Sequence, residues 1–216
     1  MKNIIAAIVF CSLGLYVSAQ KKIEKNFSFN GKNEVNLNLQ IADSIKILTW
    51  NKNEVGVKAS ISINENKDNE DYLVKFDEEG SQIKVKAQLD PEKRRNYQWH
   101  SDSNCCRYET DIYWEVYVPE KATVDIETIN GNITITGKTS AIKAYSISGF
   151  IDLAVPADLK ADFKFSTITG TVYSNIAMNN PGASKKSHAD IVSKYNGGGT
   201  PVNLKTISGD IFVRKP

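Results

Sequence analysis

The side chains with the most reactive chemistry are two adjacent cysteines. The sequence of 216 residues holds 2 His and 3 Cys, and Cys105 is followed directly by Cys106. Neighbouring Cα atoms lie about 3.8 Å apart, whereas a relaxed disulfide holds its Cα atoms about 4.4–6.8 Å apart. Four interpretations stay open: two free thiols, a disulfide to another chain, a strained vicinal disulfide, or a metal site with His100 and Asp102. Because the paired C-x-x-C spacing of zinc sites is missing, we expect no metal.

Carboxylates gather in two short clusters, at residues 68–71 and 77–79. Paired carboxylates act in acid–base and glycosidic chemistry when they flank a substrate, but clusters in polar turns are more often a solvated face. The sequence also lacks H-E-x-x-H, G-x-S-x-G, a phosphate-binding loop and a dinucleotide-binding glycine set. Repeated Gly-Asp units could bind calcium, but only Asp210 is acidic among the four equivalent positions. We therefore expect no catalytic residue and no cofactor.

The polar stretch at residues 90–110 holds the best candidates for binding a partner. These candidates are Arg94, Arg95, Tyr97 and Trp99. Aromatic and arginine side chains are common anchors of protein interfaces, and aromatic rings also stack on sugars. The alternative is a connecting loop whose Trp99 packs back onto the fold.

The composition is that of a folded chain with nearly balanced charge. Apolar residues make up 41%, charged residues make up 24%, and the formal net charge is +2. This balance argues against a disordered tail and against a generally basic nucleic-acid binder. We therefore expect no nucleic-acid partner.

The first 19 residues have the pattern of a secretory signal peptide. A charged start at Lys2 precedes an uncharged apolar run over residues 4–16, and small residues lead to a cleavage site between Ala19 and Gln20. The run is shorter than the roughly 20 residues of a membrane-spanning helix, which disfavours an anchor. A lipoprotein modified at Cys11 is disfavoured because bulky Phe10 precedes that residue. We expect an exported protein, in the periplasm, on the outer surface or secreted, with no membrane span after cleavage.

One tetrapeptide recurs four times and indicates the fold. The copies are Thr128-Ile129-Asn130-Gly131, Ser146-Ile147-Ser148-Gly149, Thr167-Ile168-Thr169-Gly170 and Thr206-Ile207-Ser208-Gly209. Alternating apolar residues surround each copy, which is typical of strands with one buried face. A strand that runs through the glycine keeps Ile129, Ile133 and Ile135 on one inward face, whereas a hairpin turning at Asn130-Gly131 would mix polar and apolar side chains.

We therefore predict an all-β fold, a single-stranded β-solenoid of coils of about 20 residues, each stacked on the last. The four glycines are expected to face inward, at corners where one backbone approaches another. The interval from Gly170 to Gly209 is about two units long, so it should hold one degenerate coil. The predicted organisation is a signal peptide at 1–19, an irregular β region with polar loops at 20–118 and solenoid repeats at 119–216.

Three features together resemble a known family. These are the stretch Ser44–Val55, the Val118-Pro119 pair before a strand, and the repeated Ile-Ser-Gly units of residues 118–216. The sequence resembles the "putative adhesin" family of bacterial exported β-solenoid proteins, a domain of unknown function related to head GIN domain proteins. Its signal ending, Val-Ser-Ala-Gln, is similar to those of Bacteroidetes-type bacteria. The resemblance implies a fold and an exported location, and it carries over no binding residue.

The function expected from the sequence is a non-catalytic, adhesin-like scaffold. It would present a side or an end of the solenoid to a cell-surface polymer or an envelope protein. Two alternatives stay open: a polysaccharide-active enzyme of the β-helix type, which would need a ladder of carboxylates on neighbouring coils, and a sensory or assembly partner in the envelope. Nothing in the sequence indicates the ligand or the oligomeric state.

Overall fold

The computed structural model describes residues 20–93, 109–178 and 190–216. Most of these residues lie in strands, and a short 3-10 helix, η1 (Asn69–Asp71), precedes the fifth of them. The strands are β1 (Lys21–Ser28), β2 (Glu34–Leu39), β3 (Ile41–Trp50), β4 (Glu54–Ile63), β5 (Tyr72–Glu79), β6 (Gln82–Leu89), β7 (Thr110–Pro119), β8 (Thr123–Thr136), β9 (Ala141–Ser148), β10 (Ile151–Ala154), β11 (Ala161–Ser166), β12 (Val172–Ser174), β13 (Ile191–Tyr195), β14 (Thr200–Ser208) and β15 (Ile211–Arg214). The all-β prediction is confirmed.

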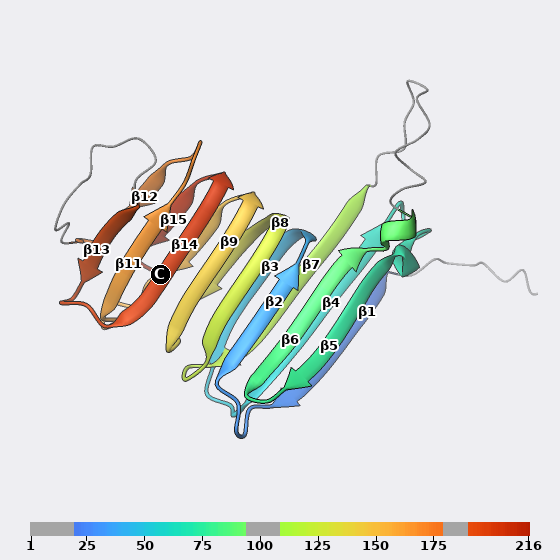
Figure 1. Ribbon diagram of the computed structural model, residues 1–216, viewed down its shortest axis with the longest axis horizontal. Coiled ribbons are helices and arrows are strands. Elements are labelled where there is room, and N and C mark those ends of the chain that lie inside the picture. Colours follow the sequence, from blue (N-terminus) through green and yellow to red (C-terminus); the bar gives the residue numbers. More distant parts are fainter. Residues whose placement is uncertain (1–19, 94–108, 179–189) are drawn as a thin grey trace, which may run out of the picture.

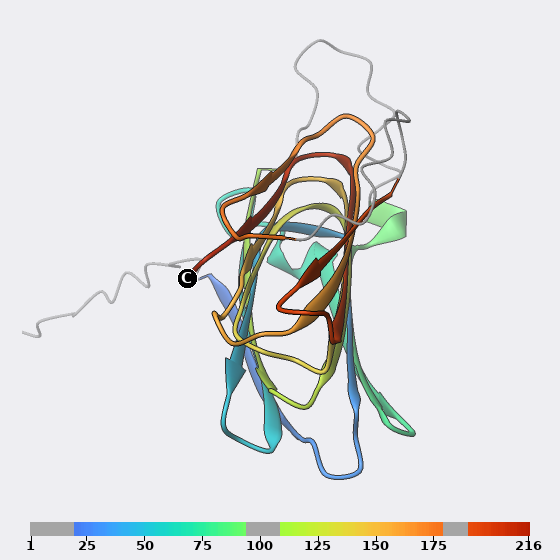
Figure 2. The same ribbon diagram turned by 90° about the vertical axis from the view of Figure 1, so that its left-hand side faces the viewer.

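Hydrogen bonds join these strands into one sheet, which is folded into two facing layers (Figures 1 and 2). The first layer runs in the order β5, β6, β2, the first half of β8, β9, β14, β11 and β13. The second layer runs β1, β4, β7, β3, the second half of β8, β10, β15 and β12. Strand β8 passes from one layer to the other and so links them covalently.

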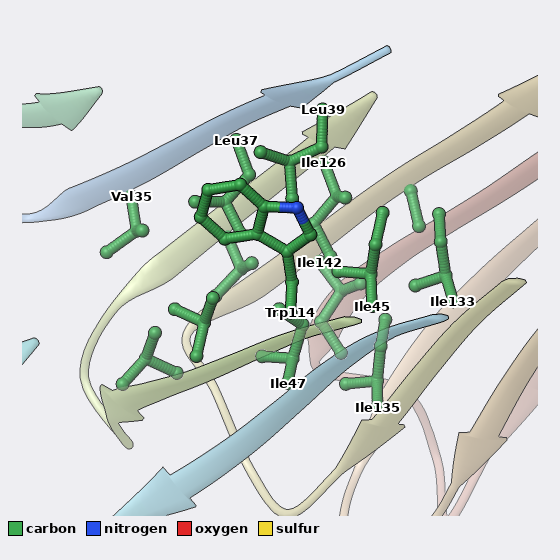
Figure 3. Packing of buried hydrophobic residues seen from close by; sticks show 14 of the residues in the cluster. Val35, Leu37, Leu39, Ile45, Ile47, Trp114, Ile126, Ile133, Ile135 and Ile142 are labelled. Atoms are coloured by element: carbon green, nitrogen blue, oxygen red, sulfur yellow. The ribbon is translucent and has the colours of Figure 1, made fainter. Parts of the chain in front are cut away.

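The hydrophobic core fills the space between the layers. Strand alternation provides it, since every second residue of β2 is buried and its neighbours point outward. Val35, Leu37 and Leu39 from the first layer face Ile45 and Ile47 from the second, and Trp114 lies among them (Figure 3). Trp114 is 1% exposed. The two outer faces are left for polar side chains and for any binding function.

Five strand–bend–strand units within the described residues stack in parallel at the centre. They are β2/β3, β8, β9/β10, β14/β15 and β11/β12, in that spatial order. The predicted stacking of each unit on the previous one is wrong at β14/β15, which lies between β9/β10 and β11/β12. The repeated apolar positions of these units are so alike that Val202 of β14 fits equally beside Ile142 and beside Phe163.

Antiparallel strands border this central stack on both sides. Strands β1, β4 and β7 pair antiparallel at one end, as do β5 and β6, while β13 pairs antiparallel with β11 at the other. A solenoid made only of stacked coils would contain none of these pairs. The degenerate coil expected between Gly170 and Gly209 is not formed by the described residues of that interval, because β13 turns back along β11. A reversed strand of this kind ends the row of parallel partners in the first layer.

Candidate binding surfaces

The four repeat glycines form a ladder at the bend between the layers, in the order Gly131, Gly149, Gly209 and Gly170. A Cβ atom built on Gly149 would collide with the carbonyl oxygen of Gly131, one on Gly209 with that of Gly149, and one on Gly170 with that of Gly209. A Cβ on Gly131 would lie 2.8 Å from the carbonyl oxygen of Ala42. Each glycine therefore occupies a place where the next backbone leaves no room for a side chain.

The isoleucine of each repeat faces outward, which corrects the prediction that Ile129 shares the inward face. Ile129 is 43% exposed and Ile168 is 53% exposed, whereas the preceding Thr128, Ser146 and Thr206 are buried. The alternation of inward and outward side chains is therefore interrupted between the hydroxyl residue and the glycine, and not before the isoleucine as predicted. We call the outward residues the isoleucine row: Ile129, Ile147, Ile207 and Ile168.

The inward hydroxyls have a physical reason to replace isoleucine. A bend takes backbone carbonyls out of the strand ladder, and a buried carbonyl needs a hydrogen-bond donor. Ser146 Oγ donates to the Gly131 carbonyl at 3.2 Å, and Thr206 Oγ1 donates to the Gly209 carbonyl at 2.7 Å. Ser146 and Thr206 are therefore part of the bend, whereas the buried Thr128 Oγ1 has no hydrogen-bond partner among the described residues.

The residue after the glycine also serves the neighbouring backbone. Asn132 Oδ1 accepts a hydrogen bond from the Phe150 amide at 3.2 Å, and Asp210 Oδ1 accepts one from the Thr171 amide at 2.8 Å. Among the described residues, no three His, Cys, Asp or Glu side chains lie close enough together to hold a metal ion. The single Gly-Asp step in the repeats thus has a structural partner.

Three aromatic side chains form a row on the outer face of the second layer. Phe212 of β15 stacks on Tyr173 of β12 with ring centroids 5.3 Å apart and an interplanar angle of 11°. Phe150, just before β10, meets Phe212 edge to face at 6.0 Å. Phe150 is 37% exposed and Tyr173 is 50% exposed. We call these three residues the aromatic row.

An ion pair fixes the polar side of the aromatic row. Asp152 lies directly beside Phe212 across the parallel ladder. Arg214 donates to Asp152 through two N–H groups, with Nε 2.7 Å from Oδ1. Planar two-point contacts of this kind hold both side chains in place. The aromatic row therefore ends beside a fixed pair of opposite charges.

The same outer face carries a groove at the other end of the layer, where β1, β4, β7 and β3 lie side by side. The groove has a volume of about 340 Å³. Tyr113, 48% exposed, stands between the small side chains of Ser60 and Ser44. The pKa of Tyr113 is raised, chiefly because the negative charge of nearby Asp111 opposes ionisation. Charges of both signs line the groove, and Glu24 pairs with Lys58 at 3.3 Å.

The partner-binding residues expected from the sequence lie outside the described residues. Arg94, Arg95, Tyr97 and Trp99 fall in 94–108, as do Cys105 and Cys106, and Ala19 precedes the described chain. The aromatic row was missed, although strand alternation places Phe212 and Tyr173 outward. What the sequence does not show is that β15 and β12 are neighbours.

No helix in the described residues is long and apolar enough to cross a membrane. No protein-family model matches this chain, and no curated protein matches it either. This chain does resemble a solved structure over nearly its whole length.

That likeness is to the crystal structure of a putative cell adhesion protein from Clostridium sporogenes. It has a TM-score of 0.55 at 14% sequence identity, and covers 92% of this chain and 100% of the other. The crystal structure of a putative adhesin from Bacteroides fragilis covers 92% of this chain and 99% of the other at 10% identity, but its TM-score of 0.23 is too low to relate the folds. This chain therefore shares its fold with the putative cell adhesion protein from Clostridium sporogenes.

Proposed function

We propose that this protein is an exported, non-catalytic, adhesin-like scaffold that binds a cell-surface polymer or protein through the outer face of its second layer. The aromatic row is the observation that carries the proposal. Exposed aromatic side chains dominate the energetics of many interfaces. Phe212 of β15 contacts both Tyr173 of β12 and Phe150, the residue before β10, so the three rings present one continuous surface.

The scaffold in this proposal is the central stack, taken as a short β-solenoid with antiparallel strands at its ends. Parallel ladders hold β10, β15 and β12 in fixed register. Side chains on such a ladder lose little freedom on binding, and a surface that is already ordered binds with a smaller entropic cost. The fold shared with the Clostridium protein, and the name of that protein, support an adhesive role.

Export rests on the signal-peptide pattern of residues 1–19. The charged pair Asp152–Arg214 next to Phe212 offers polar contacts at the edge of the apolar row. An aromatic centre with a polar rim is the usual anatomy of a binding patch. The loop residues Arg94, Arg95, Tyr97 and Trp99 stay in the proposal as a second contact region.

The test is to remove the aromatic row without disturbing the fold. A variant carrying Phe212→Ala and Tyr173→Ala is compared with the wild-type protein for binding to bacterial cell surfaces, measured by flow cytometry of the labelled protein. We expect about a thirtyfold loss of affinity, since an interface anchor contributes about 2 kcal/mol or more.

The matched control is Leu73→Ala, which removes a 36%-exposed apolar side chain from β5 of the first layer. This control should bind cells as the wild-type protein does. Equal binding by the wild-type protein and the double variant, both folded by circular dichroism, would contradict the proposed surface. Release of sugar from cell-wall polysaccharide by the purified protein would contradict the non-catalytic role.

A further inference from the structure

The outer face of the first layer carries a shallow cleft centred on Tyr145 of β9. Two adjoining hollows, each of about 200 Å³, share Glu127 and Tyr145. Asn38 and Ile129 border the first hollow, and Asn203 and Lys205 border the second. We call the two hollows together the Tyr145 cleft. It lies on the opposite layer from the aromatic row, so it is a separate surface.

Strand register lines the cleft with one side chain per strand. Asn38 pairs with Glu127, Glu127 with Tyr145, and Tyr145 with Lys205. These residues lie on β2, β8, β9 and β14, so the line crosses four parallel strands. At about 4.8 Å per strand, the line is about 14 Å long. A ligand in this cleft would lie across the strands, along the direction of the stack.

The polar groups of the cleft have unused hydrogen-bonding capacity. Asn38 and Asn203 are half-buried, and neither side-chain amide forms a hydrogen bond with any described residue. The carboxylate of Glu127 has Lys143 as its nearest cation, at 4.0 Å, while Lys143 lies 2.8 Å from Asp125. Amides and a carboxylate in this state can bind the hydroxyl groups of a ligand.

The apolar part of the cleft consists of the Tyr145 ring and two isoleucine side chains. The ammonium of Lys205 lies 5.4 Å from the centroid of the Tyr145 ring on the β14 side. Tyr145 also lines the first hollow, where Ile129 and Ile147 provide apolar walls. The ring and these walls suit the C–H face of a sugar.

Charge and size decide the class of ligand. Glu127, Lys143 and Lys205 line the cleft, and Lys143 pairs with Asp125 at 2.8 Å. With that pair neutral, the charges of Glu127 and Lys205 balance, which disfavours a strongly charged chain. Each hollow is smaller than the roughly 300–1,000 Å³ of a pocket for a compact small molecule. We propose that the Tyr145 cleft binds a neutral oligosaccharide chain, with one ring against Tyr145 and hydroxyls bonded to Asn38, Glu127 and Asn203.

The test is titration calorimetry of the purified protein with four neutral probes: mannohexaose, cellohexaose, xylohexaose and maltohexaose. We expect at least one probe to bind. Tyr145→Ala should weaken that binding by about tenfold or more, and Tyr145→Phe should preserve most of it because the ring remains. Asn203→Ala, which removes only an amide, should weaken it severalfold and covers the case in which Tyr145→Ala does not fold.

Leu73→Ala is the control, because it removes a 36%-exposed side chain from β5, outside the Tyr145 cleft. It should leave probe binding unchanged. The inference is overturned if none of the four probes binds, if polygalacturonate binds more tightly than they do, or if Tyr145→Ala and Asn203→Ala bind as well as the wild-type protein. Probe binding that survives in the Phe212→Ala, Tyr173→Ala variant separates this site from the proposed adhesive surface.

Discussion

The repeated region, residues 123–214, and the region before it, residues 21–119, build the same two layers in different ways. In the repeated region parallel ladders place equivalent residues next to each other, so glycines, hydroxyls, isoleucines and aromatic rings each form rows. In the earlier region β2 and β3 pair in parallel with β6 and β7, respectively, but β1–β4, β4–β7 and β5–β6 are antiparallel pairs that place unlike residues together. In the repeated region the same kind of contact therefore recurs on several strands, whereas in the earlier region each contact joins different kinds of residue.

The use of glycine shows this difference directly. Gly209 leaves room for the backbone of the next unit. Gly56 of β4 leaves room for a side chain, since a Cβ atom there would lie 2.9 Å from the Trp50 ring. Trp50 in turn stacks on Tyr117 with centroids 5.0 Å apart. Gly209 is one of four equivalent glycines packed against neighbouring backbones, whereas Gly56 makes room for one aromatic side chain.

The largest effect should come from breaking the glycine ladder. Gly209 has a backbone conformation that other residues adopt, so Gly209→Val tests steric room alone. The added side chain must displace the Gly149 backbone, and overpacking of this kind costs about 3 kcal/mol. For a chain of this size we expect the melting temperature to fall by about 10 °C.

Gly80→Asn is the control for that change. Gly80 lies in the β5–β6 turn with φ +50°, and a Cβ there meets nothing within 4 Å, while asparagine tolerates this conformation. Its melting temperature should stay near that of the wild-type protein. A Gly209→Val protein that melts like the wild type would show that the ladder does not need its glycines.

A smaller effect, on binding alone, is expected when residues 94–99 are changed, and it tests whether these residues or the aromatic row bind the cell surface. The variant Arg94→Ala, Arg95→Ala, Trp99→Ala should keep its melting temperature and lose about thirtyfold in affinity for cell surfaces, if this loop carries an anchor of about 2 kcal/mol. A much lower melting temperature would mean that Trp99 packs into the fold. Unchanged binding and melting would leave the aromatic row as the adhesive surface.

The smallest effect concerns a pH-dependent ion pair of the earlier region. Lys84 lowers the pKa of Glu79 below its usual 4.5, because the ammonium donates a hydrogen bond to the ionised carboxylate. This contribution to stability is therefore present above pH 4.5 and is lost as the pH falls through the lowered pKa. Both side chains are solvated, so the contribution is small.

The matching measurement is urea unfolding of the wild-type protein and of Lys84→Met at pH 7 and at pH 3. The wild-type protein should be slightly more stable than the variant at pH 7, and the difference should be smaller at pH 3. A difference that grows at low pH would rule out the ion pair as its cause.

Much of the fold could be predicted from local pattern. Alternation of apolar residues gave strands such as β2 and β6, and the inward glycines marked the bends, because both features depend on residues close in sequence. The orientation of Ile129 could not be predicted in this way. Hydrophobicity alone favours burying isoleucine, and the carbonyls freed at the bend explain why Ser146 and Thr206 lie inside instead.

The candidate surfaces depended on neighbours that the sequence does not specify. Tyr173 and Phe212 are 39 residues apart, and they meet because β12 pairs with β15. Tyr145 meets Lys205 for the same reason, through the pairing of β9 with β14. Where equivalent strands could exchange partners without changing their apolar pattern, local reasoning cannot decide which side chains form a site.

The insertion of β14/β15 between two earlier units has a consequence for how the chain reaches its native state. A solenoid whose units stack in chain order can grow from one end as it emerges from a translocation channel. Here β9 and β11 both keep an open edge until residues 200–214 arrive between them. Folding thus waits on contacts that are distant in sequence, which slows it and prolongs the exposure of unpaired edges. The protein should therefore depend on chaperones during folding more than a sequentially stacked protein of equal length.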